Sequence, residues 1–197
     1  MTSDRWTNFF FKLALSAGRL SKDPSVGVGA VIVDDNNRII TTGFNGLPSG
    51  IDFNEVITPD RETRLQCTIH AEENALAFAW RDVKGMTLFS SRQPCARCAA
   101  MIVQRGISCV AYLVDPNDTI NPSWANSFEL ADEIFRQAGT DVYEFERKEE
   151  GGDEPYFAER VSPNARYPFG DMKVVDFDAA TKRLNQTLGS LDDNCPF

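Results

Sequence analysis

The spacing of hydrophobic residues along the chain predicts an alternating series of helices and strands. Apolar positions at helical spacing, or runs rich in Ala, Glu and Leu, predict helices over residues 6–20, 70–80, 95–105 and 127–137. Short β-branched and apolar runs predict strands over residues 26–33, 38–44, 86–90, 108–114 and 142–145. Strands that alternate with helices are typical of an α/β domain, in which helices pack on the faces of one sheet.

Polar stretches mark the loops and the end of this pattern. Residues 45–50 form a loop by composition, and residues 51–64 are polar and irregular, which favours a mobile cover. After Arg147 the composition changes to a charged, glycine-bearing linker. We therefore expect one domain over residues 1–147 and an acidic C-terminal extension of unknown role over residues 148–197.

Charge and cysteine usage restrict the partners and the cellular compartment that we expect for the protein. The chain of 197 residues has a formal net charge of −9, which argues against a polynucleotide partner because nucleic-acid binding depends on Lys and Arg. No run approaches the roughly 18 apolar residues of a membrane span, and the N-terminus lacks the layout of a signal peptide. The five cysteines form no regular framework, which favours a reducing compartment. We expect a cytoplasmic protein without a nucleic-acid or membrane partner.

Two short motifs carry the candidate chemistry: His70-Ala71-Glu72 and Pro94-Cys95-Ala96-Arg97-Cys98. One imidazole and two thiolates are three zinc ligands, which leaves a fourth position open for water as in catalytic zinc sites. Cys95 and Cys98 are three residues apart on a predicted helix and therefore share one face. Glu72 is placed to move protons beside the metal. The pattern H-x-E…P-C-x-x-C is the signature of zinc-dependent nucleobase deaminases.

Other sites remain compatible with the same residues. A C-x-x-C pair also occurs as a redox pair or as half of a structural zinc site. A closed structural site needs a fourth ligand, and Cys67 is the plausible one because His70 is the only histidine of the chain. A regulatory or structural zinc module without catalysis is thus the alternative from a different class, and the presence of Glu72 argues against it.

Residues 6–146 resemble the deoxycytidylate (dCMP) deaminases of the cytidine deaminase superfamily. The stretches that carry the resemblance are Ser21-Lys22-Asp23-Pro24-Ser25, Val28-Gly29-Ala30-Val31-Ile32-Val33, Gly43-Phe44-Asn45-Gly46-Leu47-Pro48-Ser49-Gly50, His70-Ala71-Glu72-Glu73-Asn74-Ala75, Val83-Lys84-Gly85 and Pro94-Cys95-Ala96-Arg97-Cys98-Ala99. The resemblance implies a three-layer α/β/α fold with a mixed five-stranded sheet. It implies His70, Cys95 and Cys98 as ligands of one Zn²⁺ and Glu72 as the proton shuttle.

The same resemblance implies further contacts and partners. It places Asn45 near the sugar and base, and the Ala71 backbone near the pyrimidine carbonyl. It implies a homo-oligomer, often a hexamer, with dCTP and dTTP as effectors and Mg²⁺ as a companion of the bound effector. Family members with a second, structural zinc use extra histidines for it, so we expect no second zinc here.

The residues that bind a substrate phosphate are less clearly marked. Lys22 and Ser25 lie in a loop before a predicted strand, and Arg92 and Gln93 precede the cysteine helix. Each of them is also compatible with an ordinary solvated surface position.

The sequence thus predicts hydrolytic deamination of dCMP to dUMP and ammonia, which supplies dUMP for thymidylate synthesis. The alternatives within the superfamily are a deaminase of dCTP or of a 5-substituted dCMP, and a tRNA adenosine deaminase. The acidic charge and the Gly-Phe-Asn-Gly loop argue against the tRNA enzyme.

Overall fold

The computed structural model describes residues 3–51, 60–115, 122–146, 158–160 and 173–174. The helices are α1 (Ser3–Gly18), α2 (Arg61–Cys67), α3 (Ala71–Ala77), α4 (Ala96–Gln104) and α5 (Pro122–Ala138). The strands are β1 (Gly29–Val33), β2 (Ile39–Phe44), β3 (Thr87–Ser90), β4 (Cys109–Val114), β5 (Asp141–Glu146), β6 (Ala158–Arg160) and β7 (Lys173–Val174).

The strands form one mixed sheet in the order β2-β1-β3-β4-β5-β6-β7. Strand β1 pairs antiparallel with β2 and β3, while β3, β4 and β5 run parallel. The predicted five-stranded mixed sheet is confirmed. The sequence did not predict β6 and β7, which come from the C-terminal extension and continue the sheet beyond β5.

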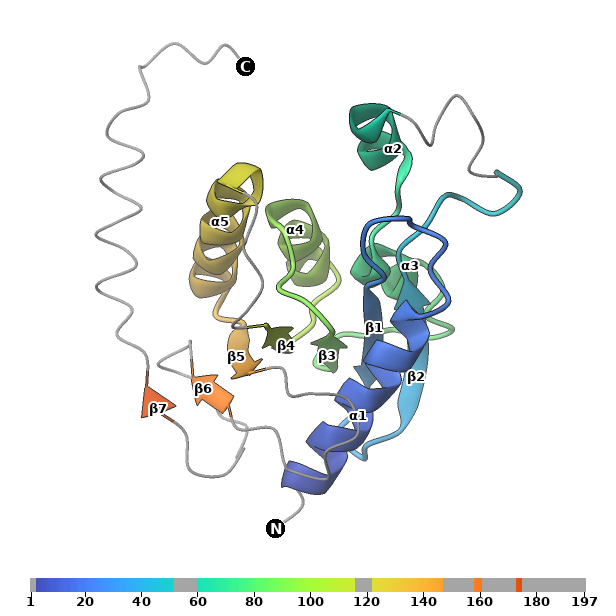
Figure 1. Cartoon of the computed structure of the whole chain (residues 1–197). Coiled ribbons are helices and arrows are strands. Elements are labelled where there is room, and N and C mark those ends of the chain that lie inside the picture. The colour runs from blue at the N-terminus through green and yellow to red at the C-terminus, as the bar shows by residue number, and fades with distance from the viewer. Residues whose placement is uncertain (1–2, 52–59, 116–121, 147–157, 161–172, 175–197) are drawn as a thin grey trace, which may run out of the picture.

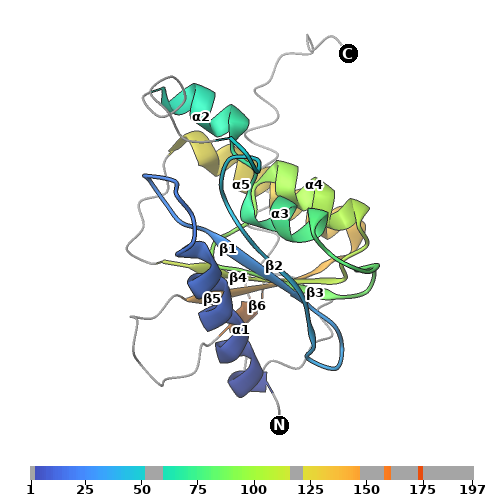
Figure 2. The same ribbon diagram turned by 90° about the vertical axis from the view of Figure 1, so that its right-hand side faces the viewer.

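Helices cover both faces of the sheet, which confirms the predicted three-layer α/β/α fold. Helix α1 lies on one face, and α3, α4 and α5 lie on the other (Figures 1 and 2). Strand β1 is buried along its whole length because it lies between both layers. Its Ala30 and Ile32 pack toward α3, while Val31 and Val33 pack toward α1. On the α1 side, the rings of Phe10 and Phe11 contact the Phe89 ring, at centroid distances of 5.0 and 5.3 Å.

Several element bounds differ from the sequence prediction. Residues 60–64, expected to be irregular, instead begin α2, where the Asp60 side chain caps the helix by accepting from the N–H groups of Glu62 and Thr63. Residues 52–59 of the expected cover lie outside the described residues, as does the linker 148–155. Helix α5 begins at Pro122, five residues before its predicted start.

Two helices follow directly on the carboxyl ends of parallel strands. Helix α4 follows β3 and α5 follows β4, so the first turns of both helices lie at one edge of the sheet. Ligand sites of α/β folds gather at such edges. Among the helices of the described residues, none combines the length and apolar character that crossing a membrane requires.

Gly43 on β2 lets α3 pack closely against the sheet. A Cβ atom there would lie 2.3 Å from the Ala71 carbonyl oxygen and 2.4 Å from the Ala75 nitrogen, both rigid backbone atoms. We expect Gly43→Ala to lower the free energy of unfolding by about 1–3 kcal/mol, because the helix must move away. Chemical denaturation measures this change.

Gly46→Ala is the matched control, because nothing lies within 4 Å of a Cβ atom at that position. An unfolding free energy that falls equally in both variants would contradict the close packing of α3 on Gly43.

Candidate active site

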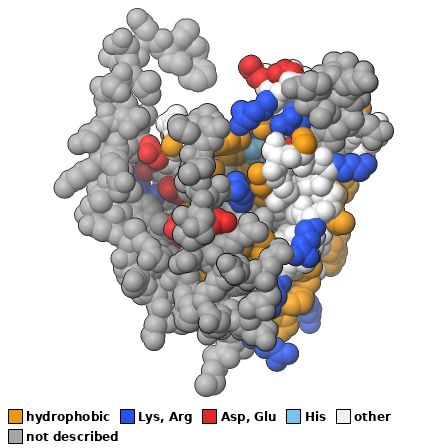
Figure 3. Space-filling model, viewed as in Figure 1, with side chains coloured by type: hydrophobic (Ala, Val, Ile, Leu, Met, Phe, Trp, Pro, Cys, Tyr) orange, Lys and Arg blue, Asp and Glu red, His pale blue; other side chains and the backbone are white. Residues whose placement is uncertain are grey.

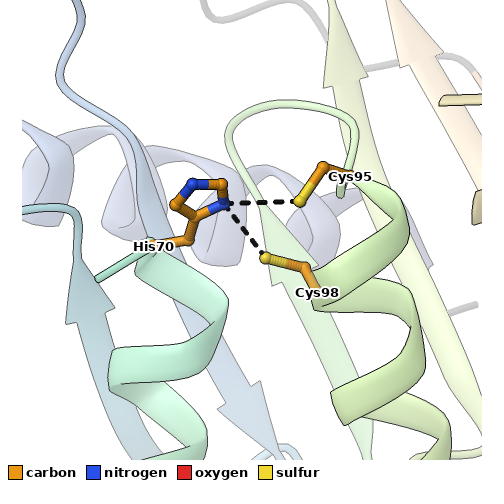
Figure 4. A group of neighbouring side chains, drawn as sticks. All are labelled: His70, Cys95 and Cys98. Atoms are coloured by element: carbon orange, nitrogen blue, oxygen red, sulfur yellow. Dashed lines mark hydrogen bonds between the residues drawn. The ribbon is translucent and has the colours of Figure 1, made fainter. Parts of the chain in front are cut away.

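His70, Cys95 and Cys98 converge at the starts of two neighbouring helices. The Cys95 and Cys98 sulfurs lie 3.4 and 3.3 Å from Nδ1 of His70. Figure 4 shows the imidazole at the beginning of α3 and both sulfurs pointing toward it from the beginning of α4. The donor atoms of the three side chains all lie within 4.8 Å of one another. No other such group of three occurs among the described residues.

Local sequence explains how the helix starts present these side chains. His70 is the N-cap residue of α3 and Cys95 that of α4, with extended backbone at both positions. Pro94 precedes the second cap, where its fixed φ favours the extended entry into a helix. Cys98, three residues after Cys95, then projects from the first turn on the same side.

An ion pair fastens the two helix starts to each other. The Glu73 carboxylate accepts from the backbone N–H of His70 at 2.9 Å. It also accepts two bonds of 2.6 Å from the Arg97 guanidinium on α4. Such a two-bond pair fixes orientation as well as distance. It therefore sets the spacing between His70 and the cysteine turn.

The group fits a zinc ion. Ligands placed 2.0–2.3 Å from a tetrahedral ion lie about 3.5 Å apart, close to the observed nitrogen–sulfur distances. Cys67 lies exposed on α2 and is not part of the group, so the described residues offer no closed four-ligand site. One imidazole and two sulfurs leave a tetrahedral ion one open position.

The two sulfurs have opposite pKa shifts. A hydrogen bond from Cys98, together with His70, lowers the pKa of the Cys95 thiol to about 4 despite its burial. The same hydrogen bond, together with burial, raises the pKa of Cys98. Two adjacent sulfurs that compete for one proton need a cation to be thiolates together, which is what a zinc ion provides.

Glu72 is buried directly beside this group. Only 3% of the residue is exposed. Its Oε1 accepts from the Ser90 hydroxyl at 3.1 Å, and its Oε2 lies 3.5 Å from the Cys98 sulfur. Burial raises the pKa of the Glu72 carboxyl. A carboxyl with a raised pKa can both accept and release a proton near neutral pH.

A cavity of about 370 Å³ opens over these residues, which is within the range of small-molecule sites. His70, Glu72 and Cys95 form part of its wall. Figure 3 shows Lys and Arg side chains around the hollow that contains the histidine.

The predicted substrate contacts are distributed unevenly around the cavity. Asn45, Ala71 and Ser25 line it, and so do Arg92 and Gln93. Lys22 does not line the cavity and is exposed. The Asn45 side chain also accepts from Val28 N–H at 2.8 Å and donates to the Val26 carbonyl at 2.9 Å. Asn45 therefore holds the preceding loop as well as facing the cavity.

Sequence reasoning missed several residues of the cavity wall, and four of them bear on substrate binding. They are Arg61 and Arg64 on α2 and Trp124 and Phe128 on α5. The Trp124 ring lies 6.1 Å from the His70 ring and stacks on Phe128 at 6.2 Å. Extending the helical spacing backward to Pro122 would have found the aromatic pair, since Pro is common at a helix start.

A half-buried carboxyl on α5 gives a stability prediction. Asp132 on α5 accepts from the Gln93 amide at 3.2 Å. Burial, with the nearby Glu144 and Glu129 charges, raises the pKa of Asp132 to about 7. The folded protein therefore binds a proton that the unfolded chain releases near pH 4, so folding loses stability as pH rises from about 4 to about 7.

Asp132→Asn removes this cost without changing the shape of the side chain. We expect the variant to be more stable than wild type at high pH. Its gain in unfolding free energy over wild type should be about 2–3 kcal/mol larger at pH 8 than at pH 5. Urea unfolding at both pH values measures the difference, and comparing the two proteins at each pH cancels the zinc contribution. A difference that does not vary with pH would contradict the raised pKa.

Comparisons with known proteins agree with this geometry. Residues 4–114 match the family described as the cytidine and deoxycytidylate deaminase zinc-binding region. An uncharacterised deaminase from the luxG 3′ region of Aliivibrio fischeri is 41% identical over 138 residues, covering 70% of this chain and 92% of its own. The deoxycytidylate deaminase of Homo sapiens is 34% identical over 189 residues, covering 93% of this chain and 92% of its own.

The human match covers too much of the chain to stop at residue 147, so it extends into the C-terminal extension. The resemblance found from the sequence covered residues 6–146 and did not include that extension. Among solved structures, the dCMP deaminase of cyanophage S-TIM5 in complex with dCMP and dUMP aligns with a TM-score of 0.55 and 25% identity. It covers 71% of this chain and 96% of its own. Motif, fold and comparisons agree that the chain belongs to the zinc-binding cytidine and deoxycytidylate deaminase family.

Proposed function

We propose that the chain hydrolyses dCMP to dUMP and ammonia. The observation that carries the proposal is the buried Glu72 carboxyl beside the His70, Cys95 and Cys98 group, in one cavity of nucleotide size. The human and cyanophage relatives named for dCMP deamination support this substrate.

His70, Cys95 and Cys98 would hold one zinc ion. When bound, zinc lowers the pKa of a coordinated water to near 7 and thereby supplies hydroxide at neutral pH. Glu73 and Arg97 keep the helix starts, and with them the ligands, at a fixed separation.

Glu72 moves the protons of the reaction. The carboxylate accepts a proton from the attacking water and delivers it to N3 of the cytosine ring. A second proton, taken by Glu72 from the hydroxyl that is now on C4, goes to the exocyclic nitrogen as its bond to C4 breaks, so that ammonia leaves and a C4 carbonyl remains. Ser90 donates to Oε1 of Glu72 and thereby orients the carboxyl.

The cavity wall would position the base and sugar. Trp124, Phe128 and Val28 give it an apolar side, against which a planar ring can lie. The Ala71 backbone and Asn45 remain our candidates for polar contacts to the pyrimidine and the sugar.

A panel of substrates tests the proposal. Zinc-loaded, full-length protein is assayed for ammonia release with dCMP, dCTP, 5-methyl-dCMP, cytidine and tRNA. We expect the highest kcat/KM for dCMP. Higher values for dCTP or 5-methyl-dCMP would move the assignment to those nucleotides, deamination of tRNA would make the chain an adenosine deaminase, and no turnover would favour a non-catalytic module.

Several broader properties are part of the same proposal. Residues 1–147 would form the catalytic domain, with residues 148–197 as an extension. The resemblance to dCMP deaminases favours a homo-oligomer, a hexamer in many relatives, that binds dCTP or dTTP together with Mg²⁺. The cysteine usage of the chain favours a location in the cytoplasm. Size measurements and assays with added triphosphate test assembly and regulation separately.

A further inference from the structure

A second polar cluster lines the cavity described above. It is separate from His70, Cys95 and Cys98, which we call the zinc group. Arg64 on α2 lines the cavity, although its side chain is only 9% exposed. Its Nη2 donates to the Ser25 hydroxyl at 3.0 Å, and its Nε lies 3.8 Å from the Asp23 carboxylate. Arg61, one helical turn earlier, also lines the cavity and is exposed.

The loop that carries Ser25 is held in place by its own hydrogen bonds. Oδ1 of Asp23 accepts from the Ser25 N–H at 2.8 Å. The Ser21 hydroxyl donates to the Asn45 carbonyl at 2.7 Å and accepts from the Asp23 N–H at 3.1 Å. The loop is thus fastened both to Arg64 and to Asn45, so the cluster is a preorganised part of the wall.

The charges and donors of the cluster favour an anion. A guanidinium stays charged in proteins, and burying it requires a negative partner. The Asp23 carboxylate lies 3.8 Å from Nε of Arg64, and Arg61, one turn earlier on α2, brings a second guanidinium to the wall of the same cavity. Because the Ser25 hydroxyl accepts from Arg64, its own hydrogen is available to donate to a bound anion.

From this arrangement we propose that Arg64, with Ser25 and Arg61, binds the 5′-phosphate of the nucleotide. The inference rests on the proposed function and deepens it, because it identifies how the site would distinguish a nucleotide from a nucleoside. Arg binds phosphate through two parallel N–H bonds, a geometry that Lys does not reproduce. Asn45, our candidate for a contact to the sugar, lies next to this cluster, because its carbonyl accepts from the Ser21 hydroxyl of the same loop.

The assignment differs from the sequence prediction, which gave Lys22, Ser25, Arg92 and Gln93 as candidates for the phosphate. Ser25 retains its place, whereas Arg64 takes that of Lys22. Asp23 acts on the ligand only indirectly, because it orients Arg64 and the Ser25 loop.

Equilibrium binding tests the inference without depending on turnover. Calorimetry on the zinc-loaded full chain compares dUMP with deoxyuridine, which differ only in the phosphate. The variants are Arg64→Gln, Arg64→Lys, Arg61→Gln and, as a control, Arg38→Gln in the exposed turn between β1 and β2.

We expect Arg64→Gln to weaken dUMP binding about 10- to 100-fold and to change deoxyuridine binding less than threefold, about the resolution of such a comparison. Arg64→Lys should recover only part of the loss because it lacks the two-bond geometry. Arg61→Gln should have a smaller effect, since solvent screens an exposed charge. Arg38→Gln should have none.

Two results would overturn the phosphate assignment. One is equal loss of dUMP and deoxyuridine binding in Arg64→Gln, which indicates that Arg64 only holds the loop in place. The other is wild-type protein that binds dUMP no more tightly than deoxyuridine. Failure of the proposed function is a different result: a wild-type protein that binds dUMP through Arg64 but does not deaminate dCMP.

Discussion

Glu72→Gln is expected to lower kcat for dCMP by about 10²–10⁴-fold while the protein keeps one zinc per chain. The amide has nearly the shape of the carboxyl and can still accept from Ser90, whose hydroxyl donates to Oε1 of Glu72 at 3.1 Å. It cannot accept the proton of water and pass it to the ring. Because Glu72 is not one of the three ligand residues, the metal should remain.

Steady-state kinetics and metal analysis on the same preparation check this expectation. Glu73→Gln is the matched control, since it lies next in sequence and does not line the cavity. This variant weakens the bonds to His70 and Arg97. It should lower kcat for dCMP less than about tenfold, because the ion pair is partly exposed. Full activity in Glu72→Gln would rule out the proposed proton transfer.

Cys98→Ser is expected to remove zinc and, with it, activity. Cys98 is fully buried and supplies one of three ligand atoms. Loss of a partner that merely supports a ligand already weakens metal binding 10- to 100-fold, so loss of the ligand itself should weaken it by more than about 100-fold. The zinc content of purified protein should fall well below one per chain, and the melting temperature should fall because bound metal stabilises the folded state.

Cys109→Ser provides the control for a buried cysteine outside the site. Cys109 lies in the core between the sheet and α1, on the face opposite α4. This variant places a hydroxyl in an apolar core and should lower stability but keep zinc and turnover. A Cys98→Ser protein with full zinc content and full activity would show that Cys98 is not a ligand.

The residues of the zinc group could be predicted because short-range sequence relations define each half of the group, and the packing of α3 beside α4 then brings the two halves together. Cys95 and Cys98 share a face of one helix turn at any position in any fold. His70 and Glu72 likewise come from one helix start. Cys109 lies in an apolar run, a pattern that predicts a core position, and only 3% of the residue is exposed.

The residues beyond the motif depended on contacts that no local pattern reveals. Arg64 resembles any other charged residue in a polar segment, and only the packing of α2 beside the Ser21–Ser25 loop places it in the cavity. Lys22 lies in that same loop but is exposed. Trp124 was missed because the predicted helix began after it, although its ring lies 6.1 Å from that of His70.

The sequence by itself determined the order of four helices and five strands along the chain and the candidate residues for zinc binding and proton transfer, because side-chain periodicity and helix geometry act over a few residues. Tertiary structure alone decided the cavity wall, the added strands β6 and β7, and which cationic side chains line the cavity. Those features join segments that are distant along the chain, such as Ser25 and Arg64. Their positions follow from how the layers pack, which depends on the whole fold rather than on any one stretch of it.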